Sequence, residues 1–371
     1  MHKIMFHLNC LELGGAERVV TNLANQFATE NYEVVVATQW QGEQEFTLEK
    51  QVRRIHVGLR PEDEGKNRFT KILLRMKYLQ DLIEQEQPDV VIAFAHNAIY
   101  RTLLAVKKNK IPTVIAVRNN PVGNYDKPID KILIPLLYGR ADGSVFQTEA
   151  QRDYFLKYIK PNATVILNPI SDKYIHAPKV ETKTKTIVHS GRIKDFKNQA
   201  MLIRAFSKVH EKHPDYDLKI YGGDSHDGTW EELLQIILKH NLRPYVSLMG
   251  QCDNLEQELP KGEVCAFSSN YEGLPNAMLE AMALGLPVVA TDCPPGGPRS
   301  VITHGENGLL IPVGDEQALA DSINQLIENP ELAAKLGENA RKISERANIQ
   351  TIHEQWKAYL EQVIQEATLQ A

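Results

Sequence analysis

Two glutamates, Glu272 and Glu280, are the residues whose type and spacing are best suited to chemistry. They follow a short apolar run that has the length and composition of a buried strand. Pro275 suits the first position of a helix and Gly285 suits the C-terminal cap, so we expect a helix over residues 275–284. Glu272 then lies in the loop at the strand end, and Glu280 lies within the helix. Such carboxylates can act as acid and base, or accept two hydrogen bonds from the vicinal hydroxyls of a sugar.

Two cations form a second candidate group, Arg192 and Lys197, directly after the apolar run 186–189. Fixed positive charges stabilise the negative charge that develops on a departing diphosphate, and they do so without a metal ion. Arginine and lysine are common after strands, so this pattern alone leaves their role open.

A glycine turn, Gly14-Gly15-Ala16-Glu17-Arg18, separates an expected strand at residues 4–8 from a helix that begins at Ala16. Glycines at such a place let backbone amides approach a phosphate or a sugar at the helix N-terminus. The turn lacks the third glycine of a dinucleotide fingerprint, which disfavours a nicotinamide enzyme.

The elements that must position these residues alternate between short β-branched runs and helical patterns, which is typical of parallel α/β sheets. The expected strands are residues 4–8, 34–38, 89–94, 113–117, 143–146 and 163–167, then 186–189, 218–221, 246–249, 264–267 and 288–290. We expect an N-terminal Rossmann-like domain over 1–170, a polar linker over 171–185, a second Rossmann-like domain over 186–348 and a C-terminal helix over 349–371. Ligands bind at the carboxyl ends of the strands of such sheets.

Residues 271–285 resemble, almost residue for residue, the Glu-x7-Glu motif of glycosyltransferase family 4, whose members retain anomeric configuration and have the GT-B fold. The resemblance implies two domains facing a central cleft, with the C-terminal helix crossing back to the first domain. It places Glu272 beside the donor sugar and Glu280 on the ribose hydroxyls. The backbone around the sugar would come from Gly273, Leu274, Pro275 and Asn276.

Other segments are similar to further donor-binding elements of this family. Gly191, Arg192 and Lys197 resemble its Gly-Arg…Lys element, in which the two cations grip the donor diphosphate. Gly14 and Gly15 stand where the family closes over the donor from the first domain. The turns that contain Gly222, Gly250 and Gln251 stand where it flanks the nucleobase.

The sequence departs from the family pattern on the acceptor side. Many family members place a histidine at the end of the strand expected at 113–117, where this chain has Arg118 and Asn119. His96 and Asn97 follow the strand expected at 89–94. These four residues are therefore acceptor-side candidates.

The resemblance implies a retaining enzyme that moves a hexose or an N-acetylhexosamine from a nucleotide sugar, expected to be a UDP-sugar. The acceptor would be a hydroxyl of a glycan or lipid-linked glycan, and the product an α-glycoside. Arg192, Lys197 and Glu272 are the expected catalytic residues. No cofactor or metal is expected, since no Asp-x-Asp pair follows a strand. Alternatives are a sugar-nucleotide epimerase or a phosphorylase of the same architecture, or a non-catalytic carbohydrate-binding protein.

Composition restricts where the protein acts. A net charge of −5 and 43% hydrophobic residues fit a globular enzyme and give no reason to expect nucleic-acid binding. The start is too short and polar for a signal peptide, no apolar run could span a bilayer, and the scattered cysteines fit a reducing compartment, so we expect a cytoplasmic protein. Residues 66–77 form a basic amphipathic pattern. It predicts either a helix with its apolar face on the core, or peripheral contact with the anionic inner face of the cytoplasmic membrane.

Overall fold

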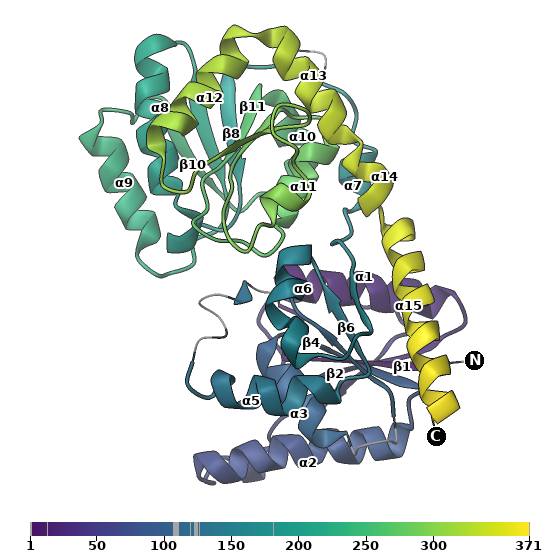
Figure 1. Cartoon of the computed structure of the whole chain (residues 1–371). Helices are drawn as coiled ribbons and strands as arrows, with labels where there is room; N and C mark the ends of the chain where they lie inside the picture. The colour runs from purple at the N-terminus through teal and green to yellow at the C-terminus, as the bar shows by residue number, and fades with distance from the viewer. Residues whose placement is uncertain are drawn as a thin grey trace. The chain divides into compact units, whose positions relative to one another are not determined.

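The computed structural model of the chain describes residues 2–12, 14–106, 111–118, 120–121, 125, 127–180 and 182–370 (Figure 1). The chain divides into two compact units, which are described separately below. Unit 1 comprises Met1–Pro169 together with Ile349–Ala371, and unit 2 comprises Ile170–Asn348. Both units are parallel α/β structures, as the alternation of patterns predicts.

Unit 1 is built on a seven-stranded parallel sheet with the strand order β3-β2-β1-β4-β5-β6-β7. The strands are β1 (Lys3–Leu8), β2 (Glu33–Thr38), β3 (Arg53–His56), β4 (Val90–Phe94), β5 (Thr113–Ala116), β6 (Gly143–Phe146) and β7 (Ala163–Val165). Its helices are α1 (Gly15–Thr29), α2 (Arg68–Glu86), α3 (His96–Ala105), α5 (Asp130–Leu137), α6 (Glu149–Phe155) and α15 (Ile349–Gln370).

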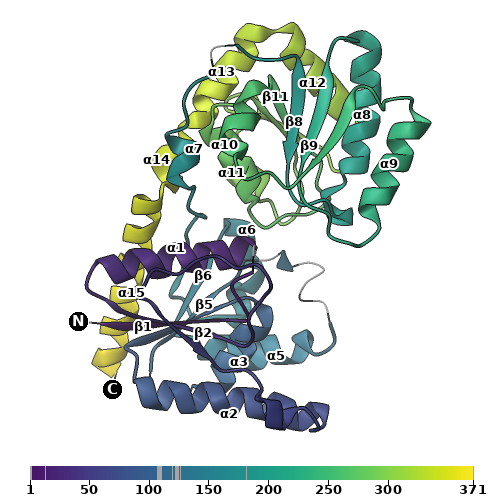
Figure 2. The same ribbon diagram turned by 180° about the vertical axis from the view of Figure 1, so that it is seen from behind.

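Helices cover both faces of this sheet, and successive strand residues divide between them (Figures 1 and 2). Phe6 of β1 packs in one core with residues of α1 and α15, whereas its neighbour Met5 packs in another with residues of α2. Both side chains are fully buried. The near-continuous apolar strands of the sequence reflect this burial on two sides.

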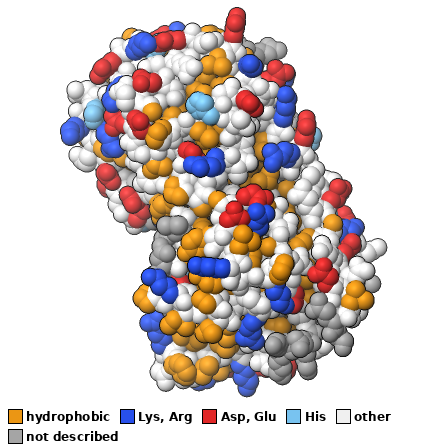
Figure 3. Space-filling view, in the orientation of Figure 1, with side chains coloured by type: hydrophobic (Ala, Val, Ile, Leu, Met, Phe, Trp, Pro, Cys, Tyr) orange, Lys and Arg blue, Asp and Glu red, His pale blue; other side chains and the backbone are white. Residues whose placement is uncertain are grey.

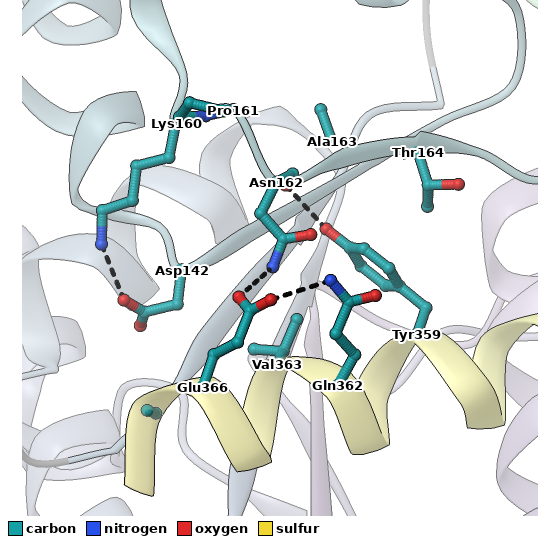
Figure 4. Close-up of a pocket in the computed structure, with 11 residues that line it drawn as sticks. Asp142, Lys160, Pro161, Asn162, Ala163, Thr164, Tyr359, Gln362, Val363 and Glu366 are labelled. Carbon is teal, nitrogen blue, oxygen red and sulfur yellow. Dashed lines mark hydrogen bonds and ion pairs between the residues drawn. The ribbon is translucent and has the colours of Figure 1, made fainter. Parts of the chain in front are cut away.

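The C-terminal helix α15 belongs to unit 1, as expected, and polar contacts hold it to the edge strand β7. The Tyr359 hydroxyl donates to the Asn162 carbonyl at 2.8 Å, and Glu366 accepts from the Asn162 amide at 3.0 Å and from Gln362 at 2.8 Å. A cavity of about 620 Å³ opens between β7 and α15 (Figure 4). The polar groups in its wall bond to one another, so these contacts serve to dock the helix.

Unit 2 contains a six-stranded parallel sheet with the order β10-β9-β8-β11-β12-β13. The strands are β8 (Thr186–Ser190), β9 (Asp217–Tyr221), β10 (Val246–Gly250), β11 (Val264–Phe267), β12 (Val288–Thr291) and β13 (Leu309–Ile311). The helices are α7 (Asp172–Ile175), α8 (Gln199–Lys212), α9 (Thr229–Lys239), α10 (Leu255–Glu258), α11 (Asn276–Ala283), α12 (Glu316–Glu328), α13 (Pro330–Arg341) and α14 (Ile343–Ala347).

The segment 171–185, which the sequence predicts as a linker, belongs to unit 2 instead. It contains α7, which packs against α11, and Tyr174 within α7 is buried. The chain passes between the units at Pro169 and Ile170, and returns at Asn348 and Ile349. Polarity and prolines suggested a linker, but the buried tyrosine anchors the segment to unit 2.

Candidate functional site

The candidate donor residues of unit 2 lie at the carboxyl end of its sheet, around the neighbouring strands β8 and β11. From this pair the chain order runs outward in opposite directions, to β9 on one side and β12 on the other. The connections therefore diverge at this point, and open parallel sheets bind ligands at such points. Lys197 follows β8 and Glu272 follows β11, so the fold brings together two residues far apart in the sequence.

The side chains of Lys197 and Glu272 form an ion pair between Nζ and Oε1. Ser269 donates a hydrogen bond from its hydroxyl to the same Oε1 at 3.0 Å. The two side chains are only 16% and 11% exposed, so the pair is largely removed from water. An ion pair in such surroundings is stronger than one on the open surface.

The backbone around Lys197 is held by residues from β11 and the loop after it. The Ser268 hydroxyl lies 2.8 Å from the Asn198 carbonyl, and the Asn270 N–H donates to the Phe196 carbonyl at 2.8 Å. The Asn198 amide also donates to the Asn270 side chain at 2.9 Å. The Phe196 and Tyr271 rings stack with their centroids 4.9 Å apart. The loops after β8 and β11 thus form one connected structure.

Asn198 and Ser268 are positioning residues that the sequence did not reveal. Asn198 has φ +49°, and its side chain accepts from the Met201 N–H at 3.2 Å, so it starts α8 directly after the lysine. An asparagine at a helix start is a signal that the sequence offers; the hydroxyl of Ser268 gives none.

Three of the predicted donor glycines lie in a row along the ends of β8, β9 and β10. A Cβ on Gly222 would lie 2.0 Å from the Gly191 carbonyl oxygen, so only glycine permits this approach. The Gly222 N–H donates to the Gly250 carbonyl at 2.8 Å. Gly191 and Gly250 have φ +148° and +70°, which also favour glycine. Gln251, directly after Gly250, is exposed.

The helix that carries Glu280 begins one residue later than the sequence predicts. Pro275 has ψ 113° and caps α11 from outside instead of occupying its first turn. At the other end Gly285 has φ +77°, and its N–H donates to the Met282 carbonyl at 2.9 Å, which closes the helix as its sequence predicts. Glu280 is only 4% exposed.

The loop that carries Glu272 and Gly273 rests on the loop after β12. The Glu272 N–H donates to the Pro294 carbonyl at 3.0 Å, and a Cβ on Gly297 would lie 1.8 Å from the Gly273 carbonyl oxygen. Leu274 is buried, Asn276 is half-buried, and both keep further interactions. The loop after β12 therefore fixes the backbone of the predicted sugar-contact segment.

Burial sets the charge state of two groups beneath this site. It lowers the pKa of His189 to about 4, so the imidazole is neutral near pH 7. Burial, followed by the charge of Glu272, raises the pKa of Cys293 to about 12, so this thiol stays protonated. Arg192, the second predicted cation, is exposed and has interactions of its own. In the described part of the chain, no three His, Cys, Asp or Glu side chains gather as a metal site would require.

In unit 1 the corresponding position lies at the carboxyl ends of β1 and β4, where His96 opens α3. Its Nε2 lies 2.8 Å from Asp130 Oδ1, and its ring stacks on Tyr125 at a centroid distance of 4.1 Å. The Tyr100 hydroxyl donates to the same Asp130 oxygen at 2.9 Å. Asn97 beside it is exposed. Asp130 was not predicted, because nothing in the sequence links it to a histidine 34 residues away.

Arg118 is not brought to this group. It is 7% exposed, and its guanidinium lies 5.4 Å from the ring centroids of both Phe94 and Trp356. Its Nη1 donates to Asn168 Oδ1 at 3.1 Å, and burial lowers its pKa to about 9. Asn119 lies outside the described residues.

The predicted glycine turn opens α1. Gly14 is its N-cap residue with extended backbone, φ −123° and ψ 168°, and no side chain caps the helix. Gly15 is the first helical residue. Gly14 itself supplies no capping side chain, and helix starts of this kind bind anions through their first amides.

The basic helix of the sequence, α2, has two apolar faces. Leu79, Leu82 and Ile83 in its C-terminal half are buried against the sheet. In its N-terminal half Phe69, Ile72 and Leu73 are each at least 46% exposed. The prediction that the apolar face of this helix packs on the core therefore holds for the C-terminal half of α2 and not for its N-terminal half.

Helix α5 presents a similar outer surface. Ile129, Ile132 and Leu136 are each at least 51% exposed, and the exposed charges of residues 127–140 are Lys127, Lys131 and Arg140. In Figure 3 the surface over α2 and α5 is mostly orange and blue. These two helix surfaces are called the α2/α5 face below. No described helix combines the length and apolarity that crossing a membrane requires.

Comparison with known proteins agrees with this fold. Glycosyltransferase Family 4 matches residues 13–174, and Glycosyl transferases group 1 matches residues 171–343. The Anabaena protein HepE, solved with UDP and glucose, superposes with a TM-score of 0.82 at 21% identity, over 98% of this chain and 100% of HepE. TarM of S. aureus, solved in complex with UDP among other ligands, gives 0.79 at 18% identity, over 97% and 100%. The fold is the GT-B fold of glycosyltransferases.

Two relatives match almost the whole chain. An uncharacterized glycosyltransferase of Haemophilus influenzae is 26% identical over 97% of this chain and 100% of its own length. A Campylobacter jejuni α-1,4-N-acetyl-D-galactosaminyltransferase, named for a diphosphate-undecaprenol-linked acceptor, is 25% identical over 98% and 99%. The chain belongs to glycosyltransferase family 4, and it is a glycosyltransferase.

Proposed function

We propose that the enzyme transfers a hexose or an N-acetylhexosamine from a UDP-sugar to a hydroxyl of a glycan or lipid-linked glycan, with retention and formation of an α-glycosidic bond. The names of the Campylobacter transferase and of a Staphylococcus aureus poly(ribitol-phosphate) α-N-acetylglucosaminyltransferase, 29% identical over 77% of this chain, support an α-linkage. The UDP complexes of HepE and TarM support UDP as the nucleotide.

The observation that carries the proposal is the Lys197–Glu272 ion pair at the meeting point of β8 and β11. In the reaction the bond between the anomeric carbon and the phosphate oxygen breaks, and a bond to the acceptor oxygen forms on the same face. The acceptor proton passes to the departing phosphate, so the protein need not supply a base. Lys197 and Arg192 stabilise the charge on that phosphate, as preorganised cations do.

Glu272 has a double role in this mechanism. Its carboxylate holds the Lys197 ammonium in place before the donor arrives. The same carboxylate, fixed by Ser269, then positions a hydroxyl of the transferred sugar. Because the lysine is already oriented, little free energy is lost in ordering its flexible side chain during catalysis.

Glu280 binds the ribose, and the loops with Gly191, Gly222 and Gly250 bind the rest of the nucleoside diphosphate. The Glu280 carboxylate is almost fully buried in α11, so it cannot rotate freely and can accept from both ribose hydroxyls at once. The loops with Gly191, Gly222 and Gly250 allow close approach of the nucleoside, with Gln251 beside the base.

No metal is required in this proposal, since the two cations supply the positive charge. An activity that a chelator abolishes and manganese restores would contradict this part.

The acceptor is proposed to bind unit 1. The His96–Asp130 pair fixes the imidazole, and the exposed Asn97 beside it offers an amide to acceptor hydroxyls. Gly14 and Gly15, at the start of α1, are proposed to contact the donor, as the family resemblance implies.

The α2/α5 face is proposed to rest on the anionic inner face of the cytoplasmic membrane. Exposed apolar side chains flanked by lysines and arginines fit the headgroup region of an anionic bilayer. Replacing Ile132 and Leu136 with serine should weaken binding to phosphatidylglycerol vesicles, whereas replacing the exposed Leu234 and Leu238 of unit 2 should not. Equal binding by both double variants would contradict membrane contact through this face.

The test of the function is a panel of UDP-sugars. We expect UDP release from one hexose or N-acetylhexosamine donor, and NMR of the transferred product should show an α-anomer. A β-anomer would contradict retention. Release of an epimerised nucleotide sugar would identify the alternative epimerase. A pyridoxal absorbance band would identify the alternative phosphorylase.

A further inference from the structure

Arg75 and Arg101 of unit 1 have no carboxylate partner among the described residues. Arg101 on α3 donates from Nη2 to the Asn9 side chain, directly after β1. Arg75 lies on α2, which packs against α3, and it makes no hydrogen bond or ion pair with any described residue. The Nε atoms of both arginines are buried and have no partner among the described residues. This arrangement leaves two cations with unused donors.

Placing these charges together is unfavourable in the protein alone. Burial, and after it the positive charge of Arg75, lowers the pKa of Arg101 to about 10. Arg53 and Arg54 on the nearby strand β3 are different, since Glu86 binds the first and Glu45 binds the second. Within the described part of the chain, carboxylates therefore pair with the arginines of β3 and not with Arg75 or Arg101.

Besides Arg75, the described groups that interact with Arg101 are Asn9 and His7. His7 lies 2.7 Å from the Thr102 hydroxyl through Nδ1 and 3.3 Å from the Gln39 amide through Nε2. Burial, and after it the charge of Arg101, holds the pKa of His7 well below its usual value. Asn9 and Gln39 carry no charge. Among the described residues no carboxylate pairs with either arginine, so an anionic ligand would find both charges unneutralised.

The chemistry of the pair fits phosphate groups. A guanidinium presents parallel N–H donors that match phosphate oxygens, and two guanidinium groups match a diphosphate. The site lies at the carboxyl end of β1, where this class of sheet binds ligands. Phe69, Ile72 and Leu73 on the preceding turns of α2 are exposed. A ligand with a diphosphate joined to a hydrocarbon chain would satisfy both features.

We propose that Arg75 and Arg101 bind the phosphate groups of a prenyl-diphosphate-linked acceptor. The inference rests on the proposed function, since it names the acceptor class of the same enzyme. It assigns to these arginines the discrimination between a phosphate-bearing acceptor and a free glycan.

The experiment titrates farnesyl diphosphate into the full chain, with UDP at saturation so that the nucleotide site is occupied. Replacement of both residues, Arg75→Gln and Arg101→Gln, should weaken binding by about tenfold to a hundredfold, as loss of charge-assisted hydrogen bonds does. Arg75→Gln alone should weaken it by about threefold to tenfold. Because the Arg75 Nε has no hydrogen-bond partner among the described residues, this variant removes no polar contact of that atom from the fold.

Matched controls separate this site from general attraction. Lys77→Gln removes an exposed charge from the same helix and should leave binding unchanged. Farnesol should bind the wild type and the arginine variants equally. Inorganic pyrophosphate should compete with farnesyl diphosphate in the wild type.

Three results would overturn the proposal. The first is unchanged binding of farnesyl diphosphate by the double variant, and the second is an equal loss of affinity in Lys77→Gln. The third is a loss of binding confined to phosphatidylglycerol vesicles, which would assign the arginines to lipid headgroups. The UDP affinity of every variant is measured in parallel. A wild type that binds farnesyl diphosphate but not UDP would contradict the donor site while supporting the arginine site, so the two failures are distinguishable.

Discussion

The two units share a parallel sheet, yet their ligand-binding ends are constructed differently. In unit 2 the bonds between the β8 and β11 loops include several to the backbone, such as the Asn270 N–H to the Phe196 carbonyl and the Ser268 hydroxyl to the Asn198 carbonyl. In unit 1 the bonds between the segment after β1 and α3 join side chains, such as Arg101 to Asn9. Loops that are held by backbone bonds suit a ligand that stays the same between related enzymes, such as a nucleoside diphosphate. Side-chain bonds suit an acceptor that differs between enzymes, because single substitutions can change them.

The two units also share one buried feature. His7 is the penultimate residue of β1, and His189 is the penultimate residue of β8. Each imidazole is fully buried, and each has a glutamine amide near its Nε2, from Gln39 in one unit and from Gln199 in the other. Burial lowers the pKa of both, so each unit holds a neutral histidine near the ligand-binding end of its sheet at pH 7.

The largest expected effect comes from Lys197→Ala. Removal of a preorganised donor to the departing phosphate should lower kcat by about 10²–10³. Lys194→Ala removes an exposed lysine from the same loop and should leave kcat unchanged. Initial rates of UDP release measure both. If Lys197→Ala keeps wild-type turnover, the connected loops after β8 and β11 have no catalytic role through this lysine.

The second effect is a loss of stability in acid. Below its usual pKa of 6.5 the unfolded His189 takes up a proton, whereas the folded one stays neutral down to about pH 4. The free energy of unfolding of unit 2 should therefore fall by about 3 kcal/mol between these pH values. His189→Asn keeps an N–H donor for the Ala266 carbonyl, which Nδ1 reaches at 2.8 Å, and should remove this dependence. Urea unfolding as a function of pH compares the two proteins, and parallel curves would show that His189 is not responsible.

The third effect tests the glycine row. Gly222→Ala places a Cβ 2.0 Å from the Gly191 carbonyl oxygen, so the loop must shift. Such overpacking costs about 1–3 kcal/mol, and UDP affinity should fall with it. Gly223→Ala is the matched control, because the nearest atom to its Cβ is Gln251 Oε1 at 4.0 Å. Thermal unfolding with and without UDP measures both variants. Equal unfolding temperatures of the two variants, with and without UDP, would mean that the loops after β8, β9 and β10 adapt to the added Cβ.

The donor unit was easier to predict from the sequence than the acceptor unit, for a physical reason. Its candidate residues lie in two short segments, each directly after a strand, and the sequence marks both. The fold then adds only the contact between the two segments. The edge strands β3 and β13 were not predicted, because β3 lacks an apolar run and β13, although apolar, has only three residues. A strand this short at the edge of a sheet gives too weak a hydrophobic pattern to distinguish it from a loop.

In unit 1 the decisive partners are distant in the sequence. The environment of Arg118 depends on Trp356, which α15 brings back to the sheet from the other end of the chain. The pairing of His96 with Asp130 likewise depends on where α5 packs. Residue types alone mark Arg118 and His96 as polar residues at strand ends, and only tertiary packing separates an exposed group from a buried one.

The smallest expected effect is that of Arg118→Met, and it tests the side-chain half of the comparison. The guanidinium has no carboxylate partner among the described residues, so its burial is costly, and replacement by an apolar chain of similar length is often neutral. Asn168 Oδ1 keeps the hydrogen bond from the Gln147 amide at 2.9 Å. Urea unfolding should therefore change by less than about 1 kcal/mol, and the KM for the acceptor should stay the same. A raised acceptor KM with unchanged stability would instead make Arg118 an acceptor ligand, and unit 1 would then bind its substrate from deeper in the sheet than His96 and Asn97 indicate.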